Sequence, residues 1–422
     1  MRIALKLSRY CFGILVALVI LGLFCPGLCS AQSRLSLQEA VDQALQSRAS
    51  LKAEAQRVAA AQGLKRQAGA ISNPEFQFEN QNLRPAQTYA QDVDTLAVFT
   101  QPLDVLGKRK QRIAVADQAI GRSQAEYEQA RRQIVQRVQL AYWIARGAQE
   151  KRDLLNATVE NFQEIVDYHS AQLSQGVISE QDFLRVRLES ERLKITANLA
   201  AIEATRARVQ LLREMGQTTF SEIVLTDPLD AHGSAIDPVN IDQVLSQRVE
   251  MRVGRALLEE AHANSRFQDV SARPDLSLIY GYKRTQLVDT TTGTNTAIAG
   301  LSITLPITNR NQGNREAATA EVRRQQQLLA ETEAGVRADY YGAVQEYDMR
   351  RHEVVETLLP LREHGAAISE IAQQAYAQGG TDLLRLLDAE RARLDAELAW
   401  IQGMVEYQQS IVNLEIAEGV SQ

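Results

Sequence analysis

Two different spacings of apolar residues alternate along this chain. The stretch from Ser36 to Ile71 has the three- and four-residue spacing of one helical face, with Leu37, Ala40, Val41, Ala44 and Leu45. Ser36 with Glu39 three residues later predicts a capping box at the helix start. Asn73-Pro74 predicts its end, because the residue before a proline avoids the α region. The first expected element is therefore one long amphipathic helix.

The spacing then changes to two, which is typical of strands. Phe76 and Phe78 alternate with polar residues, and the run 96–101 follows after a polar stretch. The runs 276–282 and 301–306 repeat this pattern later in the chain. Four strands of roughly ten residues, polar on one side and apolar on the other, have the length and period of transmembrane β-strands. Taken alone, each strand favours the alternative of a half-buried hairpin on a soluble sheet, because the transmembrane pattern is weak in a single segment. The polar loops 83–94 and 284–295 suit exposed tips.

The rest of the chain is predicted to be helical. The segment 108–175 contains no proline, and Gly121 and Gly147 are its only interruptions. The stretch 184–215 has a seven-residue apolar repeat at Leu188, Ile195, Ile202 and Val209, with alanines between them that allow close helix approach. The segments 313–378 and 383–417 repeat the arrangement, with Pro360 as the interior break. Heptads of this kind predict coiled-coil packing.

The second half of the chain repeats the first at a spacing of 200 residues. Arg48 recurs as Arg248 and Pro74 as Pro274, and Asp182-Phe183-Leu184-Arg185 recurs as Asp382-Leu383-Leu384-Arg385. The register drifts elsewhere, so that Gly107-Lys108-Arg109 pairs with Gly313-Asn314-Arg315 and Gln175-Gly176 pairs with Gln378-Gly379. We interpret residues 32–230 and 231–422 as duplicated helix–hairpin–helix units, joined through the irregular segment 216–240.

Residues 1–31 are predicted to be a secretory signal peptide. A positive start precedes the 13-residue apolar run from Phe12 to Phe24, and Cys29-Ser30-Ala31 forms a small-residue cleavage site. A permanent membrane helix would need about 20 apolar residues. A lipoprotein signal is the other alternative, but Phe24 and Leu28 stand where a small residue would precede the modified cysteine.

All three cysteines lie in this leader, so the mature chain is expected to contain neither a disulfide nor a thiolate metal site. Loss of the leader changes the net charge from −6 to −9. An acidic exported protein is a poor candidate for binding nucleic acid.

The residues give no support for an enzyme or a resident cofactor. The histidines show no metal-binding spacing and are interpreted as solvated or incidental: His169, His232, His262, His352 and His364. The charged stretch from Glu189 to Arg192, together with Glu390, Arg391 and Arg393, is interpreted as solvated helix surface.

Two glycine-containing breaks carry more information. Gln175-Gly176-Val177-Ile178-Ser179 and Gln378-Gly379-Gly380-Thr381 each interrupt a long helix and restart it with a Ser- or Thr-led cap. A tight turn between antiparallel helices accounts for both.

Taken together, these features resemble the TolC-like outer-membrane efflux family. The resemblance covers nearly the whole mature chain, with its strongest stretches at 36–41, Asn73-Pro74, 101–109 and 305–314. The segments around Gly107-Lys108-Arg109 and 309–314 look most similar to the cobalt–zinc–cadmium branch. The implied fold class is mixed α+β, mostly α. It is a homotrimer whose long coiled-coil helices form an α-barrel continuous with a transmembrane β-barrel, each chain giving four strands.

The resemblance also implies roles for particular residues. The tips Gly176, Val177, Ser179, Gly379, Gly380 and Thr381 would contact a periplasmic adaptor protein. Asp382, Arg385 and Asp388, at i, i+3 and i+6, would lie near the periplasmic aperture. Arg385 stands where relatives with two acidic rings have aspartate, and it could instead pair with Asp388.

The expected function is an outer-membrane exit duct in a Gram-negative bacterium. It would be driven by an inner-membrane pump of the RND type, export heavy-metal cations and contact outer-membrane lipid. A duct for drugs or for type I protein secretion is the alternative within transport. A periplasmic coiled-coil scaffold is the alternative from another class.

Overall fold

The computed structural model describes residues 33–83, 85, 93–230, 239–285 and 293–419. The predicted leader and parts of the two polar loops and of the 216–240 segment lie outside the described residues, and the division into units at 230 remains a prediction. The described elements are β1 (Ser33–Leu35), α2 (Leu37–Ser47), α3 (Ala49–Gly69), β2 (Glu75–Gln81), β3 (Asp94–Leu103), α4 (Lys108–Ser174), α5 (Glu180–Glu214), β4 (Ile223–Leu225), α6 (Ile241–Gln247), α7 (Val249–Ser271), β5 (Asp275–Thr285), β6 (Thr294–Thr304), α8 (Gln312–His352), the π-helix η1 (Glu353–Leu358), α9 (Leu359–Ala377) and α10 (Leu383–Glu418).

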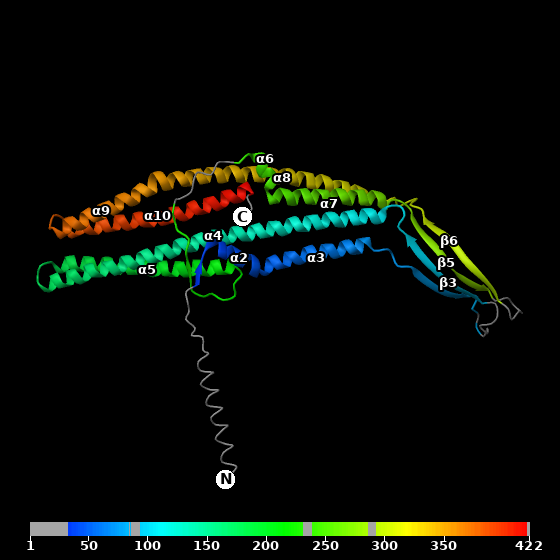
Figure 1. Ribbon diagram of the computed structural model, residues 1–422, viewed down its shortest axis with the longest axis horizontal. Helices are drawn as coiled ribbons and strands as arrows, with labels where there is room; N and C mark the ends of the chain where they lie inside the picture. The colour runs from blue at the N-terminus through cyan, green and yellow to red at the C-terminus, as the bar shows by residue number, and fades with distance from the viewer. Residues whose placement is uncertain (1–32, 84, 86–92, 231–238, 286–292, 420–422) are drawn as a thin grey trace, which may run out of the picture.

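The molecule is elongated, with the strands at one end and two helical hairpins at the other (Figure 1). The hairpins are α4 with α5 and α9 with α10, and the helices α3 and α7 lead toward the sheet. No helix in the described ranges combines the length and apolarity needed to cross a membrane.

The first predicted helix is in fact two. The capping box forms, since the Ser36 N–H donates to Glu39 Oε2 at 2.9 Å, but the helix breaks at Arg48, which has an extended backbone. Its guanidinium donates to the Glu214 carbonyl at the end of α5. Arg248 does the same at the α6–α7 break, donating to Ala417 O at 3.2 Å near the end of α10. The recurring arginines therefore bind the negative ends of two long helices.

The four predicted strands form one antiparallel sheet in the order β2-β3-β5-β6. Phe76, Phe99 and Tyr280 occupy one row across three strands, with neighbouring ring centroids 4.8 and 5.6 Å apart. Paired residues in a sheet share a face, so the alternating apolar residues lie together on one side. Their exposed fractions reach 59% at Phe78. The sheet thus presents an aromatic and aliphatic face that no described residue of the same chain covers.

The long helices differ from the sequence prediction in detail. α4 runs through Gly121 and Gly147 without a break, and a Cβ at Gly147 would overlap Cγ2 of Val405 in α10. The break in the second unit begins before Pro360, at η1, and the proline occupies the first turn of α9. Gly147 therefore permits α4 to approach α10 closely and does not interrupt the helix. The interruption in the second unit is the π-helical segment η1 between α8 and α9.

The heptad stripe of α5 does not line the coiled-coil seam within the chain. The seam uses buried alanines and valine, namely Val186, Ala197, Ala200 and Ala204. Leu188, Ile195 and Ile202 are instead 50%, 62% and 49% exposed. The alanines allow close helix approach as predicted, but the large heptad residues point away from α4.

The hydrophobic core is concentrated where the short elements pack against the middle of the long helices. One buried cluster surrounds Tyr142 and includes residues of α2, α4 and α5, and a second surrounds Tyr347 and Tyr407. β1 pairs in parallel with β4, which links the segment before α2 to the segment after α5. The short elements and the two buried clusters thus connect the α4–α5 hairpin to the α9–α10 hairpin near the middle of the molecule.

Candidate functional site

The turns of the two hairpins lie at the same end of the molecule, opposite the sheet (Figure 1). Gly176 and Gly379 adopt φ of +71° and +76°, values that glycine accepts without the Cβ penalty. At the first turn, Gly176 N donates to Leu173 O at 3.0 Å and Val177 N to Gln172 O at 2.9 Å. This pair of bonds is a Schellman motif.

The second turn repeats this geometry. Gly379 N donates to Tyr376 O at 3.0 Å and Gly380 N to Ala375 O at 2.8 Å. Both breaks predicted from sequence are therefore the same kind of helix end. Val177 is 64% exposed at the first turn.

The helix restarts are only partly as predicted. Ser179 caps α5, since its Oγ accepts from Asp182 N at 3.1 Å. At the second turn the prediction of a Thr381-led cap is wrong. Asp382 is the N-cap of α10, and its Oδ1 accepts from Arg385 N at 2.9 Å. Aspartate is as good a cap as serine, because its carboxylate accepts from the free N–H groups of the first turn.

This difference also corrects the repeat register at the tips. The matching sequences at Asp182 and Asp382 are not structural equivalents, because Asp182 lies inside α5 and Asp382 precedes α10. Gly176 is equivalent to Gly379, as the drift in register predicted, whereas Ser179 is equivalent to Asp382. The register also differs at the starts of α4 and α8. Their N-caps, both with positive φ, are Gly107 and Asn311, so Gly107 is equivalent to Asn311 and not to Gly313.

The three predicted aperture residues follow the second turn on α10. Asp382 is occupied in capping the helix. Asp388 is 61% exposed, and its Oδ1 lies 3.8 Å from Nη1 of Arg391. Within one chain, the carboxylate of Asp388 therefore pairs one turn forward with Arg391 and not backward with Arg385.

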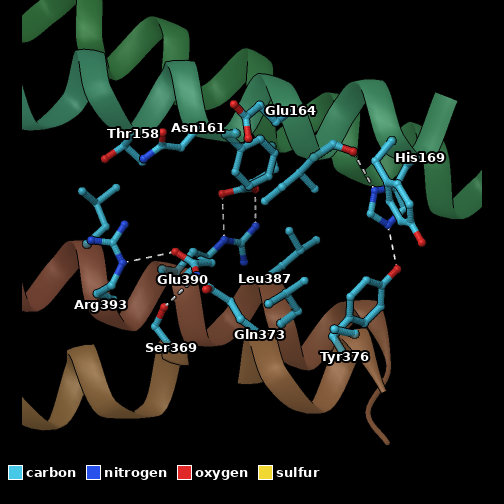
Figure 2. A pocket seen from close by; sticks show the side chains of 18 of the residues that line it. Thr158, Asn161, Glu164, His169, Ser369, Gln373, Tyr376, Leu387, Glu390 and Arg393 are labelled. Atoms are coloured by element: carbon cyan, nitrogen blue, oxygen red, sulfur yellow. Dashed lines mark hydrogen bonds and ion pairs between the residues drawn. The ribbon is translucent and has the colours of Figure 1, made fainter. Parts of the chain in front are cut away.

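A cavity of about 950 Å³ separates the two hairpins just behind their turns. Figure 2 shows side chains from both hairpins facing it, among them His169, Tyr376 and Glu390. Polar contacts at this cavity connect helices that are far apart in the sequence.

The first such connection is an ion pair. Nε of Arg391 in α10 donates to Glu189 Oε1 in α5 at 2.8 Å, and Nη2 of Arg391 contacts Oε2. Glu189 is only 8% exposed, and its hydrogen bond with Arg391 lowers the pKa of this carboxyl. The predicted solvated surface is therefore wrong at Glu189, which is buried in a two-bond pair.

The second connection is a histidine–tyrosine hydrogen bond. His169 Nδ1 lies 2.7 Å from the Ile165 carbonyl, so Nδ1 donates and Nε2 accepts from the Tyr376 hydroxyl at 2.7 Å. Burial raises the pKa of Tyr376, which keeps the hydroxyl protonated as a donor. His169 is 1% exposed. It is thus a buried link between hairpins and not the solvated histidine expected.

Sequence reasoning missed both connections because each joins residues more than 200 positions apart. Local periodicity describes one helix at a time and contains no information on which helices meet. Only sequence position indicated that these side chains could meet, since His169 precedes Gly176 by seven residues and Tyr376 precedes Gly379 by three. No group of three or more metal-ligating side chains occurs in the described ranges.

The fold and the paired hairpins are those of a channel-forming protein of the outer membrane. The family profile described as outer membrane efflux protein matches residues 40–217 and 240–420, and the chain belongs to this family. It is 25% identical over 376 residues to the cobalt-zinc-cadmium resistance protein CzcC of Cupriavidus metallidurans, covering 88% of this chain and 87% of that protein.

Solved structures agree on the fold. The outer-membrane channel OprN matches with a TM-score of 0.75 and 22% identity, over 91% of this chain and 90% of that chain. CusC, whose structures concern transmembrane channel formation, matches with a TM-score of 0.75 and 17% identity, over 91% and 92%. The profile match confirms the predicted family, and the solved structures confirm its fold.

Proposed function

We propose that three copies of this chain form the exit duct of a tripartite efflux system in a Gram-negative outer membrane. The four-stranded sheets would join into one twelve-stranded barrel in the lipid. The long helices would continue the tube through the periplasm. β2 and β6 are the edge strands of the sheet, and their outer N–H and C=O groups would have no hydrogen-bond partners in lipid. Closing three sheets into a ring would pair these groups with the neighbouring copies.

The observation that carries this proposal is the exposed apolar face of the sheet. Phe76, Phe78, Tyr280 and Tyr282 alternate along β2 and β5 and are 41% to 59% exposed. A periplasmic scaffold gives no reason for such a face, whereas contact with hydrocarbon requires one.

Two further apolar stripes support assembly with other copies. One is the heptad stripe of α5, and the other lies on α9, where Ile368 and Ile371 are 52% and 66% exposed. Stripes on different helices suit a heterologous contact, in which one surface of each copy meets another surface of the next. Such contacts close into a ring when the rotation is right, and a ring of three gives the proposed trimer.

We assign adaptor contact to the hairpin turns, formed by Gly176, Val177, Ser179, Gly379, Gly380 and Thr381. The turns are exposed at the end opposite the sheet, where a periplasmic partner would meet the tube. Gly379→Glu should abolish export without preventing assembly, because a side chain at φ +76° strains the turn. Gly379→Asn, which tolerates this φ, is the matched control. Normal export by Gly379→Glu would reject the adaptor assignment.

We place the closed aperture near Asp382, Arg385 and Asp388 on α10. Asp388 is the exposed acid of this group, and Arg391 offsets part of its charge. Three copies would set three such acids around the axis. Asp388→Ala should therefore change single-channel conductance more than Arg385→Ala.

Heavy-metal cations are the proposed cargo, delivered by an RND-type pump through the adaptor. The similarity to a protein named for cobalt, zinc and cadmium resistance supports this choice. A duct serves such cargo without tight ligands, since bound ions would slow their passage. Drug efflux and type I protein secretion use the same kind of duct and are the alternatives.

The test is deletion of the gene in its host, followed by susceptibility measurements for the three cargo classes. We expect sensitivity to cobalt, zinc and cadmium, restored by the wild-type gene. Sensitivity to drugs alone, or loss of a secreted protein alone, would replace the metal assignment while retaining the duct.

A further inference from the structure

The apolar face of the sheet continues beyond the ends of the strands. In β6, Leu301 and Ile303 belong to this face, and Leu305 and Ile307 continue the same alternation toward α8. Leu305 and Ile307 are 63% and 70% exposed. Val105, two residues after Leu103 at the end of β3, is 65% exposed. An apolar band therefore reaches the junction between sheet and helices.

Positive charge begins where this band ends. The segments 104–112 and 305–315 contain six basic side chains, namely Lys108, Arg109, Lys110, Arg112, Arg310 and Arg315, against one acid, Asp104. The whole chain has a net charge of −6. Within the described residues, Asp275, Asp104 and Asp269 form ion pairs with Lys108, Arg112 and Arg315. The local excess of positive charge therefore lies with Arg109, Lys110 and Arg310.

Backbone contacts hold several of these cations at the junction. Nε of Arg310 donates to Ile307 O at 3.2 Å, which keeps the guanidinium next to the last apolar residue of the band. Nε of Arg109 donates to Gly69 O at 2.7 Å, at the end of α3. A guanidinium carries five N–H donors, so one bond of this kind positions the charge without exhausting its donors. Lys110 and Arg310 are exposed.

We propose that Val105, Lys110, Leu305, Ile307 and Arg310, here called the junction collar, bind anionic phospholipids at the membrane surface on the helix side of the sheet. This proposal rests on the proposed insertion of the sheet in a membrane. The apolar members would lie at the edge of the hydrocarbon, and the basic members would reach the headgroup phosphates. Exposed apolar and cationic side chains that alternate within a few residues match both parts of such a lipid.

The charge pattern favours anionic over zwitterionic lipid. A zwitterionic headgroup carries its own ammonium, which the clustered cations of the collar repel. An anionic headgroup has no such group, and each nearby lysine or arginine strengthens its binding. The collar should therefore select phosphatidylglycerol over phosphatidylcholine, and high salt should weaken this selection.

The test uses the full-length protein reconstituted into vesicles of phosphatidylcholine alone and of an equimolar mixture with phosphatidylglycerol. Resistance to alkaline extraction reports insertion in each vesicle. Lipid retained after mild re-extraction, quantified by mass spectrometry, reports selection. The variant Lys110→Gln/Arg310→Gln removes two collar charges, and Lys194→Gln/Arg206→Gln removes two exposed charges from α5 as a control.

We expect insertion of all three proteins in both vesicles, with phosphatidylglycerol enriched on the wild type and the control. The collar variant should lose that enrichment by about 30-fold, since each basic side chain near an anionic surface contributes about 1 kcal/mol. Insertion without enrichment, or enrichment unchanged in the collar variant, would overturn the collar while leaving the duct intact. Failure to insert in either vesicle would overturn both.

Discussion

Single residues decide how closely the long helices can approach. Gly147 lies in the middle of α4 and faces Val405 of α10, where any Cβ would overlap the valine side chain. Gly121, in the same helix, has no neighbour within 4 Å of an added Cβ. The two glycines look alike in the sequence, but only the first has a packing role.

Gly147→Ala should therefore destabilise the protein by roughly 1–3 kcal/mol, the usual cost of overpacking a close contact. Chemical denaturation followed by circular dichroism measures this change. Gly121→Ala is the control and should be neutral or slightly stabilising, because alanine favours the helix. Adding Val405→Ala should recover part of the loss. Equal stability of the two alanine variants would show that α4 and α10 do not meet at Gly147.

The pair Glu189–Arg391 predicts a pH dependence at the cavity. Its hydrogen bond lowers the pKa of Glu189 from an ordinary value of 4.5. A lowered carboxyl pKa stabilises the folded state above that ordinary value, and the contribution is lost as the pH falls through the folded pKa. The contact should hold the hairpins together at neutral pH and weaken only below about pH 4.5.

Hydrogen exchange in α5 and α10, the two helices that this pair joins, measures this effect. Glu189→Gln should speed hydrogen exchange near the cavity at neutral pH. The free energy of opening should fall by about 1 kcal/mol, a modest value because Arg391 is half exposed. The variant should also lose the dependence of exchange on acid pH. Glu191→Gln, in an exposed i,i+4 pair with Arg187, is the matched control. Identical exchange in both variants would mean that the pair does not join the hairpins.

Among the site residues, those with a local signature could be predicted from sequence. Gly176 and Gly379 interrupt long helical patterns, and both turns lie where those interruptions indicated. Asp382 could not be recognised as a cap, because the repeat suggested equivalence with Asp182. His169 and Glu189 have no local signature, and only the tertiary arrangement gives them Tyr376 and Arg391 as partners.

At the scale of elements, periodicity predicted whether a segment is a helix or a strand better than it predicted which other elements the segment packs against. The two-residue alternation predicted all four strands, because their apolar residues lie on one face whatever covers it. Its bounds were wrong for the fourth strand, since β6 begins at Thr294, within the predicted polar loop, and ends at Thr304. The seven-residue repeat of α5 predicted coiled-coil packing without identifying the partner helix, and its large residues Leu188, Ile195 and Ile202 are exposed within the chain. A heptad shows that a stripe is buried in an assembly, but it does not show whether the partner is α4 or another copy.

Because the stripe of α5 is exposed within the chain, a substitution there should disrupt assembly of the proposed trimer without unfolding the chain. Ile195→Asp should abolish the trimer, because it puts a charge into a buried contact between copies. The helical content should remain, since Ile195 is 62% exposed within the chain. Native mass spectrometry of the detergent-purified protein gives the oligomeric state.

Thr196→Asp is the control for this substitution, because it adds the same charge one position away on an exposed part of the same helix. It should leave the trimer intact. A trimeric Ile195→Asp variant would show that the stripe does not form the contact between copies.

At the scale of the whole molecule, the sheet and the hairpin turns occupy opposite ends of one elongated chain (Figure 1). The sheet exposes an apolar face, and the helices expose apolar stripes, so the single chain leaves uncovered the surfaces that membrane and neighbouring copies would cover. The placement of the sheet and the hairpin turns at opposite ends follows from the order of elements along the chain, which the sequence repeat already indicated. The proposed contacts between copies would depend on residues that one chain cannot pair by itself.

The central claim is that the sheet crosses the outer membrane with the hairpin turns inside, and cysteine labelling tests it most directly. Residues 32–422 contain no cysteine, so single cysteines at Thr88, Thr291 and Val177 can be probed with a membrane-impermeant thiol reagent on intact cells. Thr88 and Thr291 belong to the polar loops outside the described residues. We predict labelling at Thr88 and Thr291 on intact cells, and labelling at Val177 only after the outer membrane is permeabilised. Labelling at Val177 on intact cells, with both loop positions protected, would contradict the account.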